Sequence, residues 1–390
     1  MRVLFIALSL WCLYGMGRLP DEEKLQSISP PSVAEIKRAI DRGVLFLLDT
    51  QNKDGSWGDH TKTALFGDAF LTSRHAFRAA VTAIALSALI EMDTKRAEHA
   101  IESGKDWLLK NLPSVRRVSN EEIYNIWAHA FGIQALVRLL RISPKDQRTK
   151  IVEVIHSQIE FLKRFESVYG GWGYLDFDFH TRQPSADPTS FMTATVLIAL
   201  FEAKQAGIKI PEEMVKRAIV VVQQQALPGF SYLYKRSLKW SPVKSWEKDS
   251  RKEGKEGSVN LLGGSLGRSQ ACNVALKLWG DSQITEAVIK NWLVRLYNHH
   301  FWLDAGRKRP IPHASYYSVA AYFFYYGHYY GALAIEQLPL ASRRPFQEHM
   351  ARILVDRQEN DGSWWDWPLY NFHQAYGTGF ALMSLKRALE

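Results

Sequence analysis

The feature that most constrains the fold of this 390-residue chain is a short segment that recurs along it. Residues 46–57 read FLLDTQNKDGSW, and residues 353–364 read ILVDRQENDGSW. Both copies have an apolar pair, then Gln, then Gly and Trp, at the same spacing. Residues 161–172, FLKRFESVYGGW, keep the spacing with Glu166 in the Gln position. Such self-similarity is typical of proteins built from stacked supersecondary units.

Weaker copies complete a series along the whole chain. The six copies begin at residues 46, 107, 161, 220, 292 and 353, which are 54 to 72 residues apart. Each interval has room for two helices and two loops. The sequence therefore predicts six helical hairpins.

The two helices of a hairpin differ in kind. Residues 33–48 have one apolar stripe and one charged face, with Ser32 and Glu35 as a capping box, which predicts a surface helix. Residues 79–90 and 189–201 are apolar nearly all round and must be buried on every side. Such an alternation predicts an all-α (α/α)6 toroid, with an inner ring of helices inside an outer ring. The expected outer and inner pairs are 33–50 with 75–91, 95–111 with 121–141, 145–166 with 188–205, 211–226 with 268–280, 283–299 with 315–336, and 345–358 with 373–389.

The recurring segment has a structural interpretation. Gln51 would end an outer helix, where its amide can satisfy a loose carbonyl. Gly55 allows a turn that a Cβ would block, and Trp57 would pack over the corner. We therefore expect Trp57, Trp172 and Trp364 to be buried where outer helices lead to inner ones.

These segments resemble the QW motifs of squalene and oxidosqualene cyclases. The resemblance implies the toroid of terpenoid cyclases and protein prenyltransferases. It also implies terpenoid-like cyclisation, with Asp176 or Asp178 as proton donor, because Asp176-Phe177-Asp178-Phe179 is the nearest match to the Asp-x-Asp-Asp motif of those cyclases. Prenyl transfer is less favoured, since Gln270 stands where that family's Asp-x-Cys zinc motif needs Asp before Cys272.

The N-terminus has the pattern of a signal peptide. Arg2 precedes an apolar run over 3–14, and Gly15-Met16-Gly17 offers a cleavage site with small residues. We therefore expect residues 1–17 to direct export, residues 18–31 to form a linker, and residues 32–390 to form one toroid domain. A retained membrane anchor is the alternative, so membrane contact stays open. After cleavage only Cys272 remains, which excludes an internal disulfide.

The loops indicate where a site would lie. Links from outer to inner helices are longer than the return links, and binding residues favour long loops on rigid scaffolds. These loops gather where the inner helices begin, and converging helix N-termini favour an anionic ligand there. The same end collects many polar residues: His60, Arg74, His75, Asp176, Asp178, His180, Arg182, Asp187, Arg268, Asn273, His300, Asp304, His313, Tyr316, Asp366, His373 and Tyr376.

Three of those residues are candidates for catalysis. His75, His313 and His373 lie near the starts of inner helices in hairpins one, five and six, which are neighbours in a closed ring. We expect them to face one cavity and to serve acid–base chemistry. Structural histidines are the alternative; metal binding is a further one, although we expect no metal or other cofactor.

Aromatic residues form a candidate ligand-binding wall. Nine Tyr and Phe residues cluster at 316–330. Aromatic faces can stabilise a carbocation or stack against a sugar, and they can also simply fill the core of a wide ring. The expected ligand-binding residues are Tyr316, Trp127, His129, Tyr322, Tyr376 and Arg268.

Charge adds little to the assignment. The formal net charge of +9 includes a basic stretch at 235–256 with Trp240 and Trp246 inside it. Export and the absence of a nucleic-acid-binding pattern argue against nucleic acid as a partner. Three hypotheses follow: an exported toroid that binds and transforms a ligand by cyclisation, a polysaccharide lyase or glycosidase, and a non-catalytic envelope module. A small molecule or oligosaccharide is the expected partner, and the sequence leaves the oligomeric state open.

Overall fold

The computed structural model describes residues 23–59, 73–115, 125–174, 187–235, 259–260, 262–313 and 318–390. Within these ranges the chain is helical, and its β-structure is limited to two isolated bridges. The predicted signal peptide at 1–17 and the predicted site residues Asp176, Asp178 and Tyr316 lie outside the described residues.

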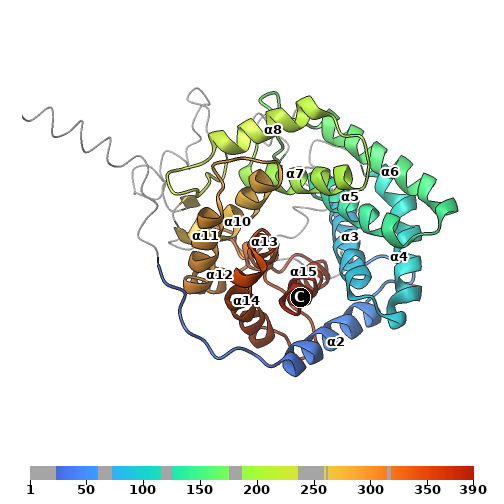
Figure 1. The fold of residues 1–390 in the computed structure, drawn as a ribbon. Helices are drawn as coiled ribbons and strands as arrows, with labels where there is room; N and C mark the ends of the chain where they lie inside the picture. The colour runs from blue at the N-terminus through green and yellow to red at the C-terminus, as the bar shows by residue number, and fades with distance from the viewer. Residues whose placement is uncertain are drawn as a thin grey trace, which may run out of the picture.

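The helices form six hairpins, each an outer helix followed by an inner one (Figure 1). The outer helices are α2 (Val33–Asp49), α4 (Glu98–Asn111), α6 (Lys145–Arg164), α8 (Glu212–Gln224), α11 (Glu286–Asn298) and α14 (Arg344–Asp356). The inner helices are α3 (Arg74–Met92), α5 (Asn125–Ile142), α7 (Ser190–Gln205), α10 (Leu262–Leu278), α13 (Phe323–Glu336) and α15 (His373–Ala388).

The inner helices close into a ring. Each packs against the next from α3 through α5, α7, α10, α13 and α15, and α15 returns to α3. The outer helices surround them, and α14 and α2 meet where the chain closes on itself (Figure 1). The predicted (α/α)6 toroid is thus confirmed.

Burial explains the two helix classes. On α2 the residues at helical spacing, such as Ile36, Val44 and Leu47, are buried, and the Ser32–Glu35 capping box is formed. On α7 every residue from Ser190 to Leu200 is buried. Helix α3 is long and apolar enough to cross a membrane, but 72% of its apolar window is buried inside the ring, as a core helix requires.

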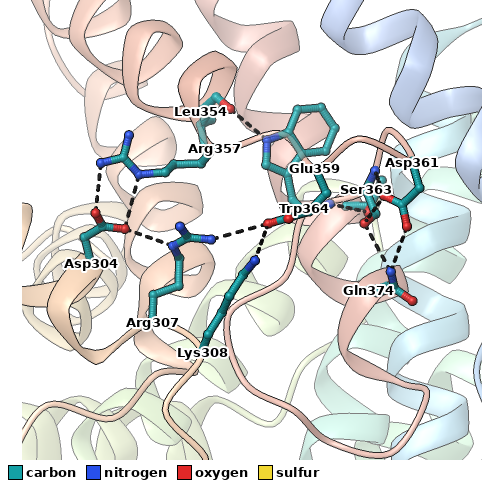
Figure 2. A network of polar contacts seen from close by, with 11 residues as sticks. Asp304, Arg307, Lys308, Leu354, Arg357, Glu359, Asp361, Ser363, Trp364 and Gln374 are labelled. Atoms are coloured by element: carbon teal, nitrogen blue, oxygen red, sulfur yellow. Dashed lines mark hydrogen bonds and ion pairs between the residues drawn. The ribbon is translucent and has the colours of Figure 1, made fainter.

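The three strongest recurring segments share one corner geometry. Trp57, Trp172 and Trp364 are fully buried. Their indole nitrogens donate to the carbonyls of Leu47, Leu162 and Leu354 at 2.7–2.8 Å. Figure 2 shows the contact between Trp364 and Leu354. Their backbone nitrogens donate to threonine hydroxyls on the following inner helix at 3.0 Å. Each tryptophan therefore joins the end of an outer helix to the start of an inner one.

The Gln and Gly of the segment have the predicted roles. The Gln51 amide donates to the carbonyls of Gly55 and Ala100 at 2.9 Å, which links neighbouring hairpins. Gly55 has a φ of +91°, and a Cβ there would lie 2.3 Å from the Ser103 carbonyl oxygen. In the third copy Glu166 instead accepts two hydrogen bonds from Arg217 at 2.8 Å.

Two inner helices begin at different places from those expected. Helix α10 begins at Leu262, six residues before the predicted 268, despite a glycine-rich start. The glycines allow close packing, since a Cβ on Gly267 would lie 2.8 Å from the Phe323 carbonyl oxygen of α13. Helix α13 begins at Phe323, not at 315, and a short helix, α12 (Phe301–Gly306), precedes it. Tertiary packing thus overrides the low helix propensity of glycine at α10.

The described part of the predicted linker crosses the outer ring before α2. The Gln26 backbone nitrogen donates to the Asn298 side-chain oxygen on α11 at 3.0 Å. His349 on α14 contacts the Gln26 carbonyl at 2.7 Å. These contacts bind the chain before α2 to the outer helices of hairpins five and six.

Candidate functional site

A cavity of about 340 Å³ lies where the inner helices begin, the end predicted from the loop lengths. Its walls come from the first halves of inner helices and from the segments that precede them. The lining residues are Phe77, Ala80, Val81, Ile84, Trp127, Phe131, Tyr174, Phe191, Tyr234, Pro312, His313, Tyr322, Phe323, Tyr326, Trp367, Leu369, Tyr376 and Phe380.

Helical spacing explains which side chains reach the cavity. Positions four apart lie on one face of a helix. Trp127 and Phe131 therefore line the cavity together from α5, and Tyr376 and Phe380 do so from α15. None of the lining residues in the described ranges is an Asp, Glu, Lys or Arg.

Aromatic rings pack against one another around the cavity. Trp127 stacks on Phe131 and on Phe191, with centroid distances of 5.7 and 6.0 Å. Phe131 meets Phe380 edge to face at 5.6 Å across the ring. Such contacts hold the rings in place with π-faces and edges available to a ligand.

Three phenols and one imidazole form a hydrogen-bonded row on one wall, which we call the phenol chain. Its members are Tyr174, Tyr234, Tyr322 and His313. The hydroxyl oxygens of Tyr174 and Tyr234 are 3.3 Å apart, and those of Tyr234 and Tyr322 are 3.2 Å apart. The Tyr322 hydroxyl lies 3.0 Å from His313 Nε2.

The Ser318 carbonyl, which contacts the imidazole of His313, sets the direction of the hydrogen bonds in this chain. His313 Nδ1 lies 2.7 Å from the Ser318 carbonyl oxygen, which can only accept, so we assign the ring proton to Nδ1. Nε2 then accepts from the Tyr322 hydroxyl, and each preceding phenol donates to the next. Burial lowers the pKa of His313, which favours this neutral form. The chain can orient a polar group of a ligand, and His313 can accept a proton through it.

A second polar feature of the cavity is a phenol on α15 that is paired with a carboxylate from the loop before that helix. The Tyr376 hydroxyl donates to the Asp366 carboxylate. Asp366 is fully buried, and burial raises its pKa to about 6. Burial, followed by the Asp366 charge, raises the pKa of Tyr376. The pair therefore combines a neutral phenol in the cavity wall with a carboxylate behind it.

The structure places four of the predicted site residues on the cavity: His313, Trp127, Tyr322 and Tyr376. The expectation that three histidines face one cavity holds for His313 alone. His75 lies 2.9 Å from the Ser114 hydroxyl oxygen and packs against Trp107, so it points towards the α4 hairpin. His373 packs edge to face against Trp365 and is not part of the lining.

His129 and Arg268 are also outside the lining. His129 follows Trp127 by two residues and so points to the other side of α5, where Nδ1 lies 2.7 Å from the Gln158 oxygen. Arg268 is fully buried and donates to the carbonyls of Tyr232, Gly264 and Val259. Its guanidinium lies 5.7 Å from the Tyr234 ring centroid, so it supports the phenol chain from behind.

Sequence reasoning missed Tyr174, Tyr234 and the role of Asp366. Tyr174 follows the corner tryptophan Trp172 by two residues, and Tyr234 follows Tyr232 by two. That shared offset from a corner aromatic could have indicated both. Asp366 was expected at this end of the ring, but nothing in the sequence pairs it with Tyr376. No group of three or more His, Cys, Asp or Glu in the described ranges is arranged to hold a metal ion.

No family model matches this sequence, and no curated protein matches it. Solved toroid structures do match its fold. The type II terpene cyclase MstE from Scytonema, in complex with geranylgeranyl dihydroxybenzoate, has a TM-score of 0.54 at 12% identity, covering 91% of this chain and 97% of that one. Cellobiose 2-epimerase from Spirochaeta thermophila has a TM-score of 0.57 at 14% identity, covering 91% and 96%. Unsaturated glucuronyl hydrolase from Streptococcus agalactiae has a TM-score of 0.56 at 12% identity, covering 96% of this chain and 97% of that one. These similarities establish the toroid fold, which hosts several chemistries.

Proposed function

We propose that the protein binds an extended, largely apolar and unsaturated ligand of the isoprenoid type in its cavity and transforms it by terpenoid-like cyclisation. The observation that carries the proposal is the lining: aromatic and aliphatic side chains form nearly all of it, and none of the described ones is charged. Burial of apolar ligand surface against such walls would supply the binding energy.

The aromatic walls also suit the reaction. Ring faces attract a positive charge by about 0.5–2 kcal/mol each, more when water is excluded. Trp127, Phe191 and Phe323 supply such rings along one side of the cavity. A carbocation formed there would be stabilised by ring faces, with no described carboxylate in the lining itself to trap it.

The phenol chain gives the cavity one polar side. A few well-placed polar groups in an apolar pocket fix the orientation of a ligand. A hydroxyl or phenol at one end of an isoprenoid chain would join Tyr234 and Tyr322, while the hydrocarbon lies against Phe131 and Phe380. The ligand would therefore be amphipathic.

The proton donor remains a prediction for Asp176 or Asp178. The described residues that flank their segment are close to the cavity: Tyr174 lines it, and the Asp187 carbonyl oxygen would lie 2.6 Å from a Cβ on Gly173. In an apolar setting a carboxyl group stays protonated and can donate to an alkene.

A second candidate is a sugar-processing enzyme. The phenol chain and His313 favour it, because hydroxyl-rich ligands pair with phenols and imidazole. Glycoside hydrolysis generally needs two carboxyl groups across the scissile bond, and the described lining has none. A non-catalytic envelope module is the third candidate.

Ligand identification separates the three candidates. Full-length protein purified without organic solvent is analysed by native mass spectrometry, and retained molecules are extracted and identified. Binding of geranylgeraniol and of an unsaturated uronic-acid disaccharide is then measured by calorimetry. Our proposal expects an isoprenoid-like ligand and binding of the alcohol only. Binding of the disaccharide alone would replace it with the second candidate, and binding of neither would favour the third.

We also propose that the protein acts after export, because residues 1–17 have the pattern of a signal peptide. N-terminal sequencing of protein from the envelope or medium tests this. A start near residue 18 supports export with cleavage, whereas an intact Met1 on envelope protein would favour the anchor.

A further inference from the structure

We propose that Tyr376 takes up the proton that the bound ligand loses, and that Asp366 is the positioning residue that receives the phenol's own proton. This inference rests on the proposed cyclisation, since a cyclising cation must lose a proton to become a neutral alkene. It assigns an acceptor to the reaction, separate from the predicted donor at Asp176 or Asp178.

The pair is placed for proton transfer out of the cavity. Tyr376 lines the cavity from α15, four residues before Phe380. Its hydroxyl donates directly to Asp366, which is fully buried behind it. Among the described residues, Asp366 is the sole carboxylate hydrogen-bonded to a side chain of the lining. A developing positive charge beside Tyr376 would therefore be stabilised by the Asp366 carboxylate behind that phenol.

Asp366 is held in position by backbone contacts. The backbone nitrogen of Tyr325, on α13, donates to Asp366 Oδ2 at 3.0 Å. The backbone nitrogen of Lys308 donates to the Asp366 carbonyl. The adjacent Trp367 donates from its indole to the Pro310 carbonyl at 2.8 Å. Helix α13 and the segment around 308–310 thus hold Asp366 beside Tyr376 on α15.

An ion-pair network supports those segments from the outside (Figure 2). Asp304 pairs with Arg307 and Arg357, each at 2.9 Å. Glu359 pairs with Lys308 at 2.7 Å and with Arg307 at 3.5 Å. The network joins α12 and the residues after it to the end of α14. It therefore ties the residues that hold the Asp366 segment to the scaffold.

The charges that face Asp366 leave it able to accept a proton. Arg307 is the cationic group near it, and Tyr325 and Tyr376 are the phenols. Burial raises the pKa of Asp366 to about 6, although Tyr376, backbone donors and Arg307 oppose that rise. A pKa there makes the carboxylate both ionised near neutral pH and basic enough to take a proton.

The step balances without a further reactant. A C–H bond next to the cationic carbon breaks, and its electron pair becomes the new C=C bond. The hydrogen joins the Tyr376 oxygen as the phenol's original proton moves to Asp366 Oδ1. After product release, the proton on Asp366 returns to the Tyr376 oxygen. The proton that Tyr376 took from the ligand then leaves through the cavity mouth.

Product analysis with geranylgeraniol as the probe tests the assignment. Full-length wild type, Tyr376→Phe, Asp366→Asn and Asp366→Glu are compared by calorimetry, steady-state kinetics and gas chromatography–mass spectrometry. Tyr297→Phe is the matched control, because it removes a buried phenol oxygen that has no hydrogen-bond partner and lies outside the cavity.

We expect Tyr376→Phe to bind geranylgeraniol as wild type does and to form the unsaturated cyclic alcohol about 100-fold more slowly, with diols from water capture of the cation in its place. Asp366→Asn should lower kcat at unchanged KM and remove the limb of the pH–rate profile near pH 6; Asp366→Glu should restore part of it. If wild type turns over geranylgeraniol, and if Tyr376→Phe and Asp366→Asn both keep its rate, products and pH profile, the inference is overturned. The proposed function would then still stand. Absence of binding and turnover in wild type would instead overturn the proposed function, and the inference with it.

Discussion

The two ends of the inner ring differ in how they hold polar groups. All six inner helices run in one direction, because each follows an outer helix of its own hairpin. At the end where they begin, the described cavity lining offers neutral phenols and one imidazole. At the end where they finish, which we call the closed end, buried ion pairs join neighbouring helices. Arg138 on α5 pairs with Glu91 on α3 and Glu202 on α7, each at 2.8 Å.

The closed end continues around the ring. Arg387 on α15 pairs with Glu91 at 2.6 Å and with Glu336 on α13 at 3.0 Å. Arginine near a helix C-terminus also opposes the negative end of the helix dipole. Every charge of this cluster is thus used in contacts between helices.

This difference separates stability from function. Charges that are paired and largely buried are committed to one arrangement and cost several kcal/mol if one partner is removed. Neutral hydroxyls on a cavity wall can exchange partners with a ligand at little cost. We therefore expect substitutions at the closed end to change folding, and substitutions at the cavity to change binding and chemistry.

The largest expected effect is at the closed end. Arg138→Ala should lower the free energy of unfolding by about 3–5 kcal/mol, because it leaves Glu91 and Glu202 close together without their shared cation. Chemical denaturation measures the change. Arg344→Ala removes a side chain that is 86% exposed and should change stability by under about 0.5 kcal/mol. A loss at Arg138 as small as that of the control would show that the closed end does not hold the ring together.

The next effect concerns pH and the cavity end. The pKa of Asp366 is raised from 3.8 to about 6 by burial, so the folded state binds its proton more tightly than the unfolded state does. Its contribution to stability is therefore full below about pH 4 and is lost as pH rises through about 6, a change of roughly 3 kcal/mol. In Asp366→Asn this decline should disappear.

Unfolding titrations between pH 4 and pH 7 measure the difference between wild type and Asp366→Asn. Titration at the closed end, where burial raises the pKa of Glu336, is the same in both proteins and cancels in the difference. Although burial opposes ionisation, Arg138 and Arg387 hold the pKa of Glu91 below its usual value, so Glu91 stays charged there. Parallel curves for the two proteins would contradict the raised pKa of Asp366.

The smallest expected effect on folding is in the phenol chain. Tyr322→Phe removes one hydrogen bond to His313 and one with Tyr234, on a half-buried side chain, and should cost about 1 kcal/mol of stability. The loss of binding free energy for a ligand with a hydroxyl end should be larger, since the variant loses the hydroxyl that links Tyr234 to His313. Thermal unfolding and calorimetry with geranylgeraniol check both. Equal loss of stability at Tyr322 and Arg138 would remove the distinction between the ends.

The corners of the toroid were predictable because their sequence encodes conformation. The spacing from Gln51 to Trp57 fixes where a helix ends, and Gly55 specifies a positive φ that other residues rarely adopt. Those constraints are local, so the six copies of the segment were enough to place the outer helices and most of the inner ones within a few residues.

Helical spacing made only part of the site predictable. Trp127 and Tyr376 lie on faces that the closed ring turns inward, whereas His129 is two residues further around the same helix and faces α6. His75 stands at the start of its helix, where the rotation that turns it towards Ser114 depends on tertiary packing. The Asp366–Tyr376 contact joins a loop to a helix, and no periodic pattern encodes it.

The central claim is that a ligand with an apolar chain occupies the cavity at the start of the inner helices, and a crystal structure of the full-length protein with geranylgeraniol tests it most directly. The account predicts the hydrocarbon chain against Trp127, Phe131 and Phe380, with the hydroxyl at Tyr234 or Tyr322 in the phenol chain. Density for the ligand at the closed end or on the outer helices, with the cavity empty, would contradict it.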